Sequence, residues 1–299
     1  MRRIFYFARF LHSMVKYKLI WNQIEHVLIH EGELYDFIPN AKDIWARDFM
    51  PFQLHNGEFL IYNYHPDYLQ GKNEKYITNC RDAFIASGGR EVLSSSFCHH
   101  TNLIIDGGNM IRCTDKNGIK CVIMTTKVFY ENPDYSHHDI ILELEECIDA
   151  EVILIPWDTN EPYGHADGMV RALSNGKLLL NCYSDFDKNL GKTIRKALEN
   201  RFEIVELTYG DSFTDSSWCH INYLELMKVT LVPVAGLKSD KIAVQQIEEY
   251  TGKKCIPILM PEIIADGGAL HCISWDMDIR VISDNNLAFF HPFLQQKFI

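Results

Sequence analysis

The chain has 299 residues, of which 47% are hydrophobic, and a formal net charge of −11. This length permits a large core in one or two domains, and no run approaches the roughly 20 apolar residues of a membrane span. The net charge disfavours nucleic acid as a partner, because phosphate binding requires a basic surface. It is compatible with a cationic substrate, although solubility is the simpler explanation.

The nine cysteines are scattered along the chain, and no CxxC motif occurs. An odd, scattered set argues against a disulfide scaffold, a zinc ribbon or a thioredoxin-like site, and favours a reducing compartment. We therefore expect a cytoplasmic protein with no nucleic-acid or membrane partner. The sequence leaves a homodimer open.

The N-terminal segment starts with basic residues followed by an apolar patch, which superficially resembles a signal peptide. However, Arg9, His12, Lys16 and Lys18 interrupt the apolar run, and no small-x-small cleavage site follows it. We therefore predict a basic amphipathic helix at this end of the chain.

Three Asn-Gly pairs recur at intervals of about 60 residues, namely Asn56-Gly57, Asn117-Gly118 and Asn175-Gly176. Each lies between strand-like runs, and Asn-Gly is the strongest short hairpin signal because a type I′ turn needs positive φ at both central residues. A fourth hairpin is predicted over Tyr223–Pro233, and a fifth is predicted to start at Cys272. The period indicates five repeated supersecondary units.

Helical patterns and short apolar strands fall between the hairpins. Lys188–Arg201 and Lys241–Tyr250 have helical spacing, and the latter follows an N-cap-type residue. Apolar strands over Val152–Pro156 and Glu203–Leu207 precede the third and fourth hairpins, so the predicted unit runs helix, strand, hairpin. With no linker or low-complexity run between units, we predict one α/β domain of pseudo-repeated blades over residues 1–299.

The polar motifs stand at one point of this repeat, just before the first hairpin strand. Asp48 precedes the first hairpin, His165 and Asp167 precede the third, and Cys272 precedes the fifth. If the units surround an axis, equivalent positions converge on it. On an extended segment, His165 and Asp167 would also point to the same face.

Such a pocket has the groups needed for C–N hydrolysis without a metal or a cofactor. A guanidinium is a planar cation whose forked N–H donors match carboxylates such as Asp48 and Asp167. Cys272 can attack its central carbon as a thiolate. His165 can protonate the departing ammonia and then activate water.

Each residue also has a structural explanation. Cysteine is often simply buried, and His165 alone would more often be a hydrogen-bonded loop residue. Trp45 is more often a core residue than one that stacks on a guanidinium. Asp106 and Asp266 each precede a Gly-Gly pair and could either shape turns or contact the edge of the pocket; we favour turns for both.

The motifs together resemble the agmatine deiminase / Porphyromonas-type peptidyl-arginine deiminase family, from about Asp43 to Trp275. The segment that starts at Asn222 also resembles the fourth unit of that family. The motif W-x-R-D-x-x-P is matched by Trp45, Arg47, Asp48 and Pro51, and G-H-x-D is matched by Gly164, His165 and Asp167. The motif G-G-x-x-H-C is matched by Gly267, Gly268, His271 and Cys272, and an acidic-Gly-Gly motif is matched by Asp106, Gly107 and Gly108.

The resemblance implies a pentein fold, a five-bladed pseudo-symmetric α/β propeller with its active site on the axis. It implies Cys272 as nucleophile, His165 as general acid and base, and Asp48 and Asp167 as guanidinium ligands. We also assign Trp45 and Asn222 to substrate binding. The segment before Trp45 looks shorter than in typical relatives, so residues 1–42 are expected to be partly atypical.

The expected activity is hydrolysis of agmatine to N-carbamoylputrescine and ammonia through a covalent Cys thiouronium, a reaction of putrescine biosynthesis. Three alternatives stay open: a free- or peptidyl-arginine deiminase, an amidinotransferase, and a guanidine-binding protein without catalysis. A substrate with an α-carboxylate would need a nearby cation, for which Arg112 and Arg171 are the candidates.

Overall fold

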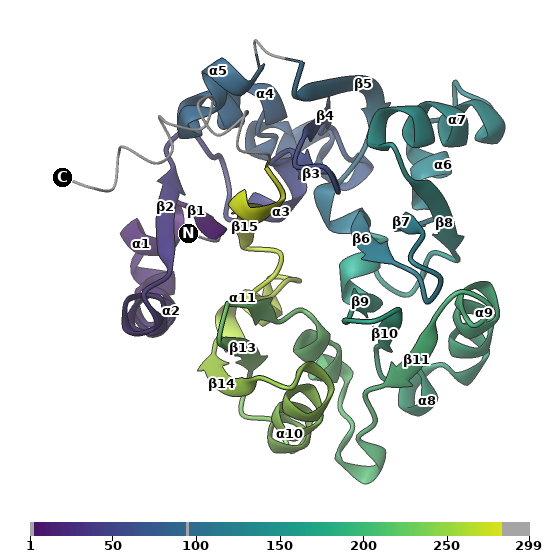
Figure 1. Ribbon diagram of the computed structural model, residues 1–299. Coiled ribbons are helices and arrows are strands. Elements are labelled where there is room, and N and C mark those ends of the chain that lie inside the picture. Colours follow the sequence, from purple (N-terminus) through teal and green to yellow (C-terminus); the bar gives the residue numbers. More distant parts are fainter. Residues whose placement is uncertain (1–2, 94–95, 283–299) are drawn as a thin grey trace.

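Five three-stranded sheets surround a central axis in the computed structural model, which describes residues 3–93 and 96–282 (Figure 1). The five-bladed α/β propeller predicted from the sequence is therefore confirmed. None of the helices in these described ranges is long and apolar enough to cross a membrane. The strands of the five sheets are β3 (Phe52–Gln53), β4 (Phe59–Asn63) and β5 (Cys98–Ile104); β6 (Ile111–Thr114), β7 (Lys120–Thr125) and β8 (Glu151–Ile155); β9 (Val170–Ala172), β10 (Lys177–Leu180) and β11 (Glu203–Glu206); β12 (Leu224–Glu225), β13 (Val229–Val234) and β14 (Lys254–Leu259); and β15 (Ser274–Asp278), β1 (Arg3–Ala8) and β2 (Leu34–Ile38).

Each sheet combines one antiparallel and one parallel strand pair. The first and middle strands are antiparallel, and the middle strand then pairs in parallel with a third strand. Because a parallel pair needs a long crossover, a helical segment connects the middle strand to the third in every sheet. The main crossover helices are α2 (Lys18–Glu31), α4 (Cys80–Phe84) with α5 (Arg90–Leu93), α7 (His137–Ile148), α9 (Lys188–Leu198) and α10 (Asp240–Thr251).

This pairing corrects the predicted order of the unit. The strands β8 and β11, predicted to belong to the hairpins that follow them, instead complete the sheets of the hairpins that precede them. The unit therefore runs hairpin, helix, strand. The two strands were predicted at nearly the correct residues. Their sheets were not, because a strand that pairs in parallel with its neighbour is not joined to it by a hairpin turn that the sequence could reveal.

The predicted Asn-Gly hairpins are present, but only one has the predicted turn. Asn175 (φ 59°) and Gly176 (φ 71°) both have positive φ, as a type I′ turn requires. At the other two sites only the glycine has a positive φ, which is 90° at Gly57 and 82° at Gly118. A single left-handed glycine fits the three-residue hairpin loop with a bulge.

The N-terminal segment departs most from the prediction. Arg3–Ala8 is not helical but forms β1, the middle strand of the fifth sheet, between β15 and β2. Its last five residues are buried, so it has the continuous apolar pattern of a strand covered on both faces. Helix begins only with α1 (Phe10–Ser13) and α2.

The strand β1 also replaces the predicted fifth hairpin, because the antiparallel partner of β15 comes from the opposite end of the chain. The two ends of the described chain thus close the propeller (Figure 1). The predicted domain also includes residues 1–2, 94–95 and 283–299, which lie outside the described residues.

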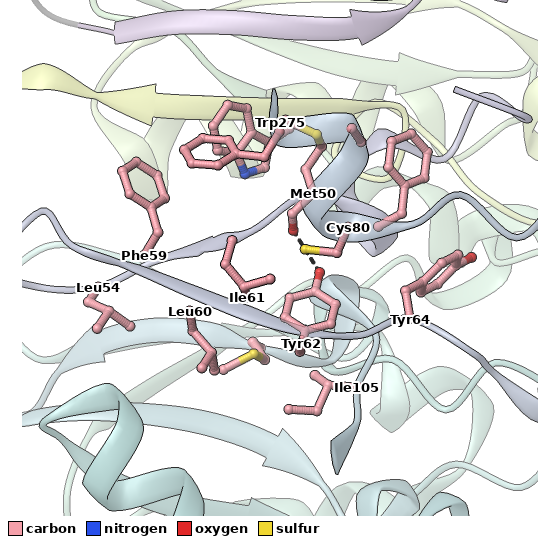
Figure 2. Close-up of a cluster of buried hydrophobic side chains, with 14 of the residues drawn as sticks. Met50, Leu54, Phe59, Leu60, Ile61, Tyr62, Tyr64, Cys80, Ile105 and Trp275 are labelled. Atoms are coloured by element: carbon pink, nitrogen blue, oxygen red, sulfur yellow. Dashed lines mark hydrogen bonds between the residues drawn. The ribbon is translucent and has the colours of Figure 1, made fainter. Parts of the chain in front are cut away.

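Trp275 of β15 ties the closing sheet to the first hairpin. Its indole lies 5.3 Å from the ring of Tyr6 and 6.1 Å from that of Phe59, measured between centroids, and its Nε1–H donates to the carbonyl of Pro51 at 2.7 Å. Figure 2 shows Trp275 and Met50 in this cluster of buried side chains.

A buried tyrosine in the same cluster fixes the short helix α3 (Ala46–Phe49). The hydroxyl of Tyr62 lies 2.7 Å from the carbonyl oxygen of Met50 (Figure 2) and 2.7 Å from that of Asp48. The core of the first blade therefore holds the backbone of Asp48 in place.

We predict that Phe7→Ala lowers the free energy of unfolding by about 3 to 5 kcal/mol, because Phe7 is fully buried in β1 and its ring lies 5.1 Å from that of Trp21. Urea unfolding measures this loss. The matched control is Val15→Ala, at a side chain that is 89% exposed, which should change stability by less than about 0.5 kcal/mol. Equal effects of the two substitutions would contradict the placement of β1 in the core.

Candidate active site

A short helical turn precedes the first strand of every sheet, and the polar motifs lie on these turns. Because the five sheets surround one axis, the five turns meet there, and the convergence predicted from the repeat is present. The five turns are α3, η5 (Gly107–Asn109), η6 (Ala166–Gly168), η8 (Asp215–Ile221) and residues 269–273.

The imidazole of His165 lies between two buried carboxylates. Its Nε2 is 2.7 Å from Oδ2 of Asp106, and its Nδ1 is 3.6 Å from Oδ1 of Asp48. The hydroxyl of Tyr68 donates to the same Oδ2 of Asp106 at 3.1 Å. His165 is thus oriented through both of its nitrogens.

The assignment of Asp106 to a turn was therefore incomplete, since this side chain is 1% exposed and is the closest carboxylate partner of His165. The Asp-Gly-Gly motif carried the signal, because it stands at the same point of the repeat as the other motifs. Asp266, by contrast, pairs with Lys16 and Tyr17 instead of the axial groups.

The glycines after Asp106 allow the turns to approach one another. A Cβ on Gly108 would lie 2.6 Å from Oδ1 of Asp48 and 2.7 Å from Nδ1 of His165. A Cβ on Gly107 would lie 2.1 Å from the carbonyl oxygen of Arg47. With no side chain in the way, the N–H of Gly108 donates to Oδ1 of Asp48 at 3.2 Å.

Cys272 is a buried thiol that faces the second predicted carboxylate. Its Sγ lies 3.6 Å from Oδ2 of Asp167, which also accepts from Nδ1 of His271 at 2.5 Å. Oδ1 of Asn222 accepts from the backbone N–H of His271 at 3.0 Å and of Cys272 at 3.1 Å. Asn222 therefore holds the turn that carries the thiol, while its own buried Nδ2 has no hydrogen-bond partner among the residues that the structure describes.

The Gly-Gly pair before Cys272 accommodates two aromatic rings. A Cβ on Gly268 would lie 2.2 Å from the ring of Trp45, and one on Gly267, where φ is +96°, would lie 2.6 Å from the hydroxyl of Tyr163. Trp45 is not among the residues that line the cavity described next. Its ring packs on the backbone of this turn.

A cavity of about 490 Å³ opens beside these groups, and Cys272, His165, Asp167 and Asn222 line it. Asp48 does not line it but contacts His165, which does. The described part of the chain contributes no lysine or arginine to this lining. The remaining lining includes the aromatic residues Tyr163, Tyr183, Phe186, Phe213 and Trp218 and the acidic residues Asp158, Glu161 and Asp215.

The structure places Arg112 and Arg171 elsewhere. Both line a separate cavity of about 240 Å³, which shares no lining residue with the first. The two arginines proposed to recognise an α-carboxylate are therefore not beside Cys272. His165 and Asp167 reach the same cavity, but only His165 has the expected extended backbone, whereas Asp167 lies in the helical turn η6.

The electrostatics of the cluster favour a bound cation. Burial raises the pKa of the Cys272 thiol well above its usual range, and the charges of Asp167 and Asp48 raise it further. Burial also raises the pKa of Asp48 well above its usual range; His165 opposes this shift, and the charges of Asp106 and Asp167 add to it. These shifts favour a protonated thiol and a neutral Asp48, and a cation beside both groups would favour their charged forms.

The two histidines have opposite charge states. Burial lowers the pKa of His165, but Asp48 and the hydrogen bond to Asp106 outweigh burial and raise it well above its usual range. For His271, burial together with Arg171 and Arg47 lowers the pKa to about 3, so its neutral ring donates to Asp167. Burial of Asp167 is in turn outweighed by that hydrogen bond, and its pKa is about 2.

The sequence matches the family described as Porphyromonas-type peptidyl-arginine deiminase over residues 7–277. The chain belongs to this family. Members of this deiminase family are guanidine-modifying hydrolases, so the resemblance inferred from the motifs is confirmed. No match was found among functionally curated proteins.

Solved structures confirm that this deiminase-family chain has the pentein fold. The agmatine deiminase of Enterococcus faecalis is 15% identical, with a TM-score of 0.69 over 92% of this chain and 93% of that one. The C. jejuni agmatine deiminase is 14% identical, with a TM-score of 0.68 and coverage of 92% of each chain. The N-terminal domain of a cyanobacterial arginine dihydrolase is 14% identical, with a TM-score of 0.58 over 92% of this chain and 98% of that one.

We predict that Asp106→Asn lowers the pKa of His165, because the amide keeps the shape of the carboxylate but not the charge that stabilises the imidazolium. Titration of the His165 ring nitrogens by NMR measures this change. Asp211→Asn, at an exposed position outside the cavity lining, is the control and should leave the titration unchanged. An unchanged or higher pKa in Asp106→Asn would show that this carboxylate does not hold the charge on His165.

Proposed function

We propose that the protein is a guanidine deiminase that hydrolyses agmatine to N-carbamoylputrescine and ammonia. The observation that carries this proposal is the 490 Å³ cavity, in which a thiol, an imidazole and a carboxylate share an acidic and aromatic lining. Family membership supports the chemistry, and the two agmatine deiminases of the same fold support the substrate.

Asp48 and Asp167 would hold the guanidinium. Their negative charges repel one another while the site is empty, and a planar cation with several N–H donors relieves this repulsion. The guanidinium would then lie next to Cys272, because the thiol already contacts Asp167. Burial strengthens these contacts by excluding water.

Substrate binding would also activate the nucleophile. The same negative charges that raise the pKa of the Cys272 thiol are neutralised once a guanidinium is bound. The thiol then releases its proton to solvent, and the thiolate is stabilised beside the bound cation, as a nucleophilic cysteine requires. The thiol therefore becomes reactive only when its substrate is present.

The reaction would proceed in two steps. The thiolate sulfur bonds to the central guanidinium carbon, and one C–N bond breaks as His165, charged in the empty site, protonates the departing ammonia. The covalent product is a Cys272 thiouronium. His165, now neutral, takes a proton from a water whose oxygen attacks the same carbon, and the carbon–sulfur bond breaks to release the ureido product and the thiol.

The lining of the cavity supports agmatine over arginine. An α-carboxylate would need a cation, whereas the described lining offers the carboxylates of Asp158, Glu161 and Asp215. Asp158 accepts from Tyr183, and Glu161 accepts from backbone N–H groups. Asp215 is exposed at the cavity and suits the terminal ammonium of agmatine.

The proposed setting follows from the same reaction. N-carbamoylputrescine is a carbamoylated diamine, so its consumption belongs to putrescine formation. The nine free cysteines suit a reducing compartment, and we place the enzyme in the cytoplasm.

We predict that Cys272→Ala lowers kcat for agmatine on the order of 10⁴-fold or more, as expected when a nucleophile is removed. Ammonia release and the ureido product are measured with agmatine, free arginine and a peptide with C-terminal arginine, and agmatine should be the best substrate. Cys147→Ala, at a half-buried thiol on α7, is the matched control and should keep full activity. Turnover of none of the three substrates by the wild type would contradict the proposal.

We predict that Asp215→Asn raises KM for agmatine about two- to fivefold with little change in kcat, because an exposed carboxylate contributes weakly to binding and does not contact the reacting atoms. Steady-state kinetics check this effect. Asp211→Asn removes a similar charge four residues away, outside the cavity lining, and serves as the control. A fall in kcat with unchanged KM would assign Asp215 to the chemistry and not to the tail of the substrate.

A further inference from the structure

The second cavity, of about 240 Å³, lies on the axis of the propeller, because the first strand of every sheet contributes to its lining. The contributing residues include Gln53 of β3, Arg112 of β6, Arg171 of β9, Glu225 of β12 and Asp276 of β15. The turn around Cys272 separates the two cavities, since His271 lines the second and Cys272 lines the first. The proposed deiminase reaction makes no use of this second space.

Its lining is basic, whereas that of the first cavity is acidic. Arg3, Arg47, Arg112 and Arg171 contribute guanidiniums, while the only carboxylates on the described lining are Glu225 and Asp276. This leaves an excess of two positive charges. Glu225 is also already paired, because its Oε1 lies 2.6 Å from Nζ of Lys253.

Asp276 is shared between two of the arginines. Its Oδ1 lies 2.9 Å from Nη2 of Arg47, and its Oδ2 lies 3.7 Å from Nε of Arg3. Nε of Arg3 also lies 3.5 Å from Oδ2 of Asp278, so both arginines are paired with carboxylates. Within residues 3–93 and 96–282, however, neither Nε of Arg3 nor Nε of Arg47 has a hydrogen-bond acceptor.

The other two arginines have no ion-pair partner in residues 3–93 and 96–282. Arg112 donates through Nη1 to the carbonyls of Gln53 and Leu54, each at 3.0 Å. The guanidinium of Arg171 lies 4.7 Å from the ring centroid of Tyr223. These contacts orient both groups but neutralise neither, and a partly buried cation without a directly paired counter-charge is costly.

We propose that this axial cavity is a binding site for a small oxyanion, a phosphate or a carboxylate, held by Arg112 and Arg171 and completed by Arg3 and Arg47. The forked N–H donors of guanidinium match the oxygens of such anions. The volume is several times the roughly 30 Å³ that one water occupies, so a tetrahedral oxyanion fits with a few waters. Apolar lining residues such as Trp275 and Met50 strengthen the attraction by lowering the local dielectric.

An anion bound in the second cavity would also affect the side chains of the first cavity. His271 lines the anion cavity while its Nδ1 donates to Asp167, the carboxylate next to Cys272. An anion beside Arg47 and Arg171 would offset the positive potential that these residues exert at His271. The site is therefore placed to tune the catalytic cluster without touching the substrate.

The experiment titrates inorganic phosphate and, separately, malonate into the full-length protein by calorimetry at constant ionic strength in chloride. At least one of the two should bind with a stoichiometry of one per chain, and the comparison distinguishes a phosphate site from a carboxylate site. Arg171→Gln and Arg112→Gln should each weaken that binding at least tenfold. Arg81→Gln, at an exposed arginine outside the cavity, and Asp215→Asn, in the first cavity, should leave it unchanged.

Folding of each variant is checked by its thermal melt without added anion. If Arg112→Gln does not fold, the comparison of Arg171→Gln with Arg171→Lys tests the proposal instead. Lysine keeps the positive charge of arginine but lacks its forked N–H donors, so Arg171→Lys should bind the anion with intermediate affinity. Absence of binding by both anions to the wild type would overturn the proposal. Binding that is unaffected by the Arg171 substitutions would also overturn it. Neither result bears on deiminase activity, which the agmatine assay tests separately.

Discussion

Repulsion among the carboxylates of Asp48, Asp106 and Asp167 is the constraint on which the site depends. All three are buried at the axis and share the imidazole of His165 and the ring of His271 as their nearby partners. Buried like charges are tolerated only when cations, hydrogen bonds or protons compensate them. At Asp48 the pKa is raised well above its usual range, and a further cation at the axis would favour the charged form of this carboxyl.

The propeller supplies the rigidity that this arrangement requires. The hydroxyl of Tyr62 contacts the carbonyl of Asp48, the amide of Asn222 holds the turn of Cys272, and the N–H of Arg47 donates to the carbonyl of Cys272 at 3.0 Å. The first contact lies within the first blade, and the other two join different blades. These contacts hold the backbone that carries the charged side chains, and in the proposed mechanism the bound guanidinium offsets the repulsion between their charges.

Much of this architecture could be predicted from local sequence signals. The Asn-Gly turns located three hairpins, and the position of Asp48, His165, Asp167 and Cys272 within the repeat indicated that they would meet. What could not be predicted depends on partners distant in sequence. The pairing of β1 with β15 joins the two ends of the described chain, and nothing local marks a fully buried strand as different from a buried helix.

The errors within the site have the same origin. Asp106 looked like a turn residue because its partner, His165, lies 59 residues away. Trp45 looked like a stacking partner for a substrate, but its ring meets Gly268 in the fold. A residue type and a motif give the chemistry that a side chain can perform, whereas the tertiary packing decides what it actually contacts.

The central claim is that Cys272 attacks a guanidinium held by carboxylates, and mass spectrometry of the intact protein tests it most directly. Protein quenched in acid during turnover of agmatine should gain the mass of agmatine less one ammonia, and peptide mapping should place this adduct on Cys272. The adduct should disappear when the substrate is exhausted. Turnover without any adduct, together with continued activity after Cys272 is alkylated, would contradict the account.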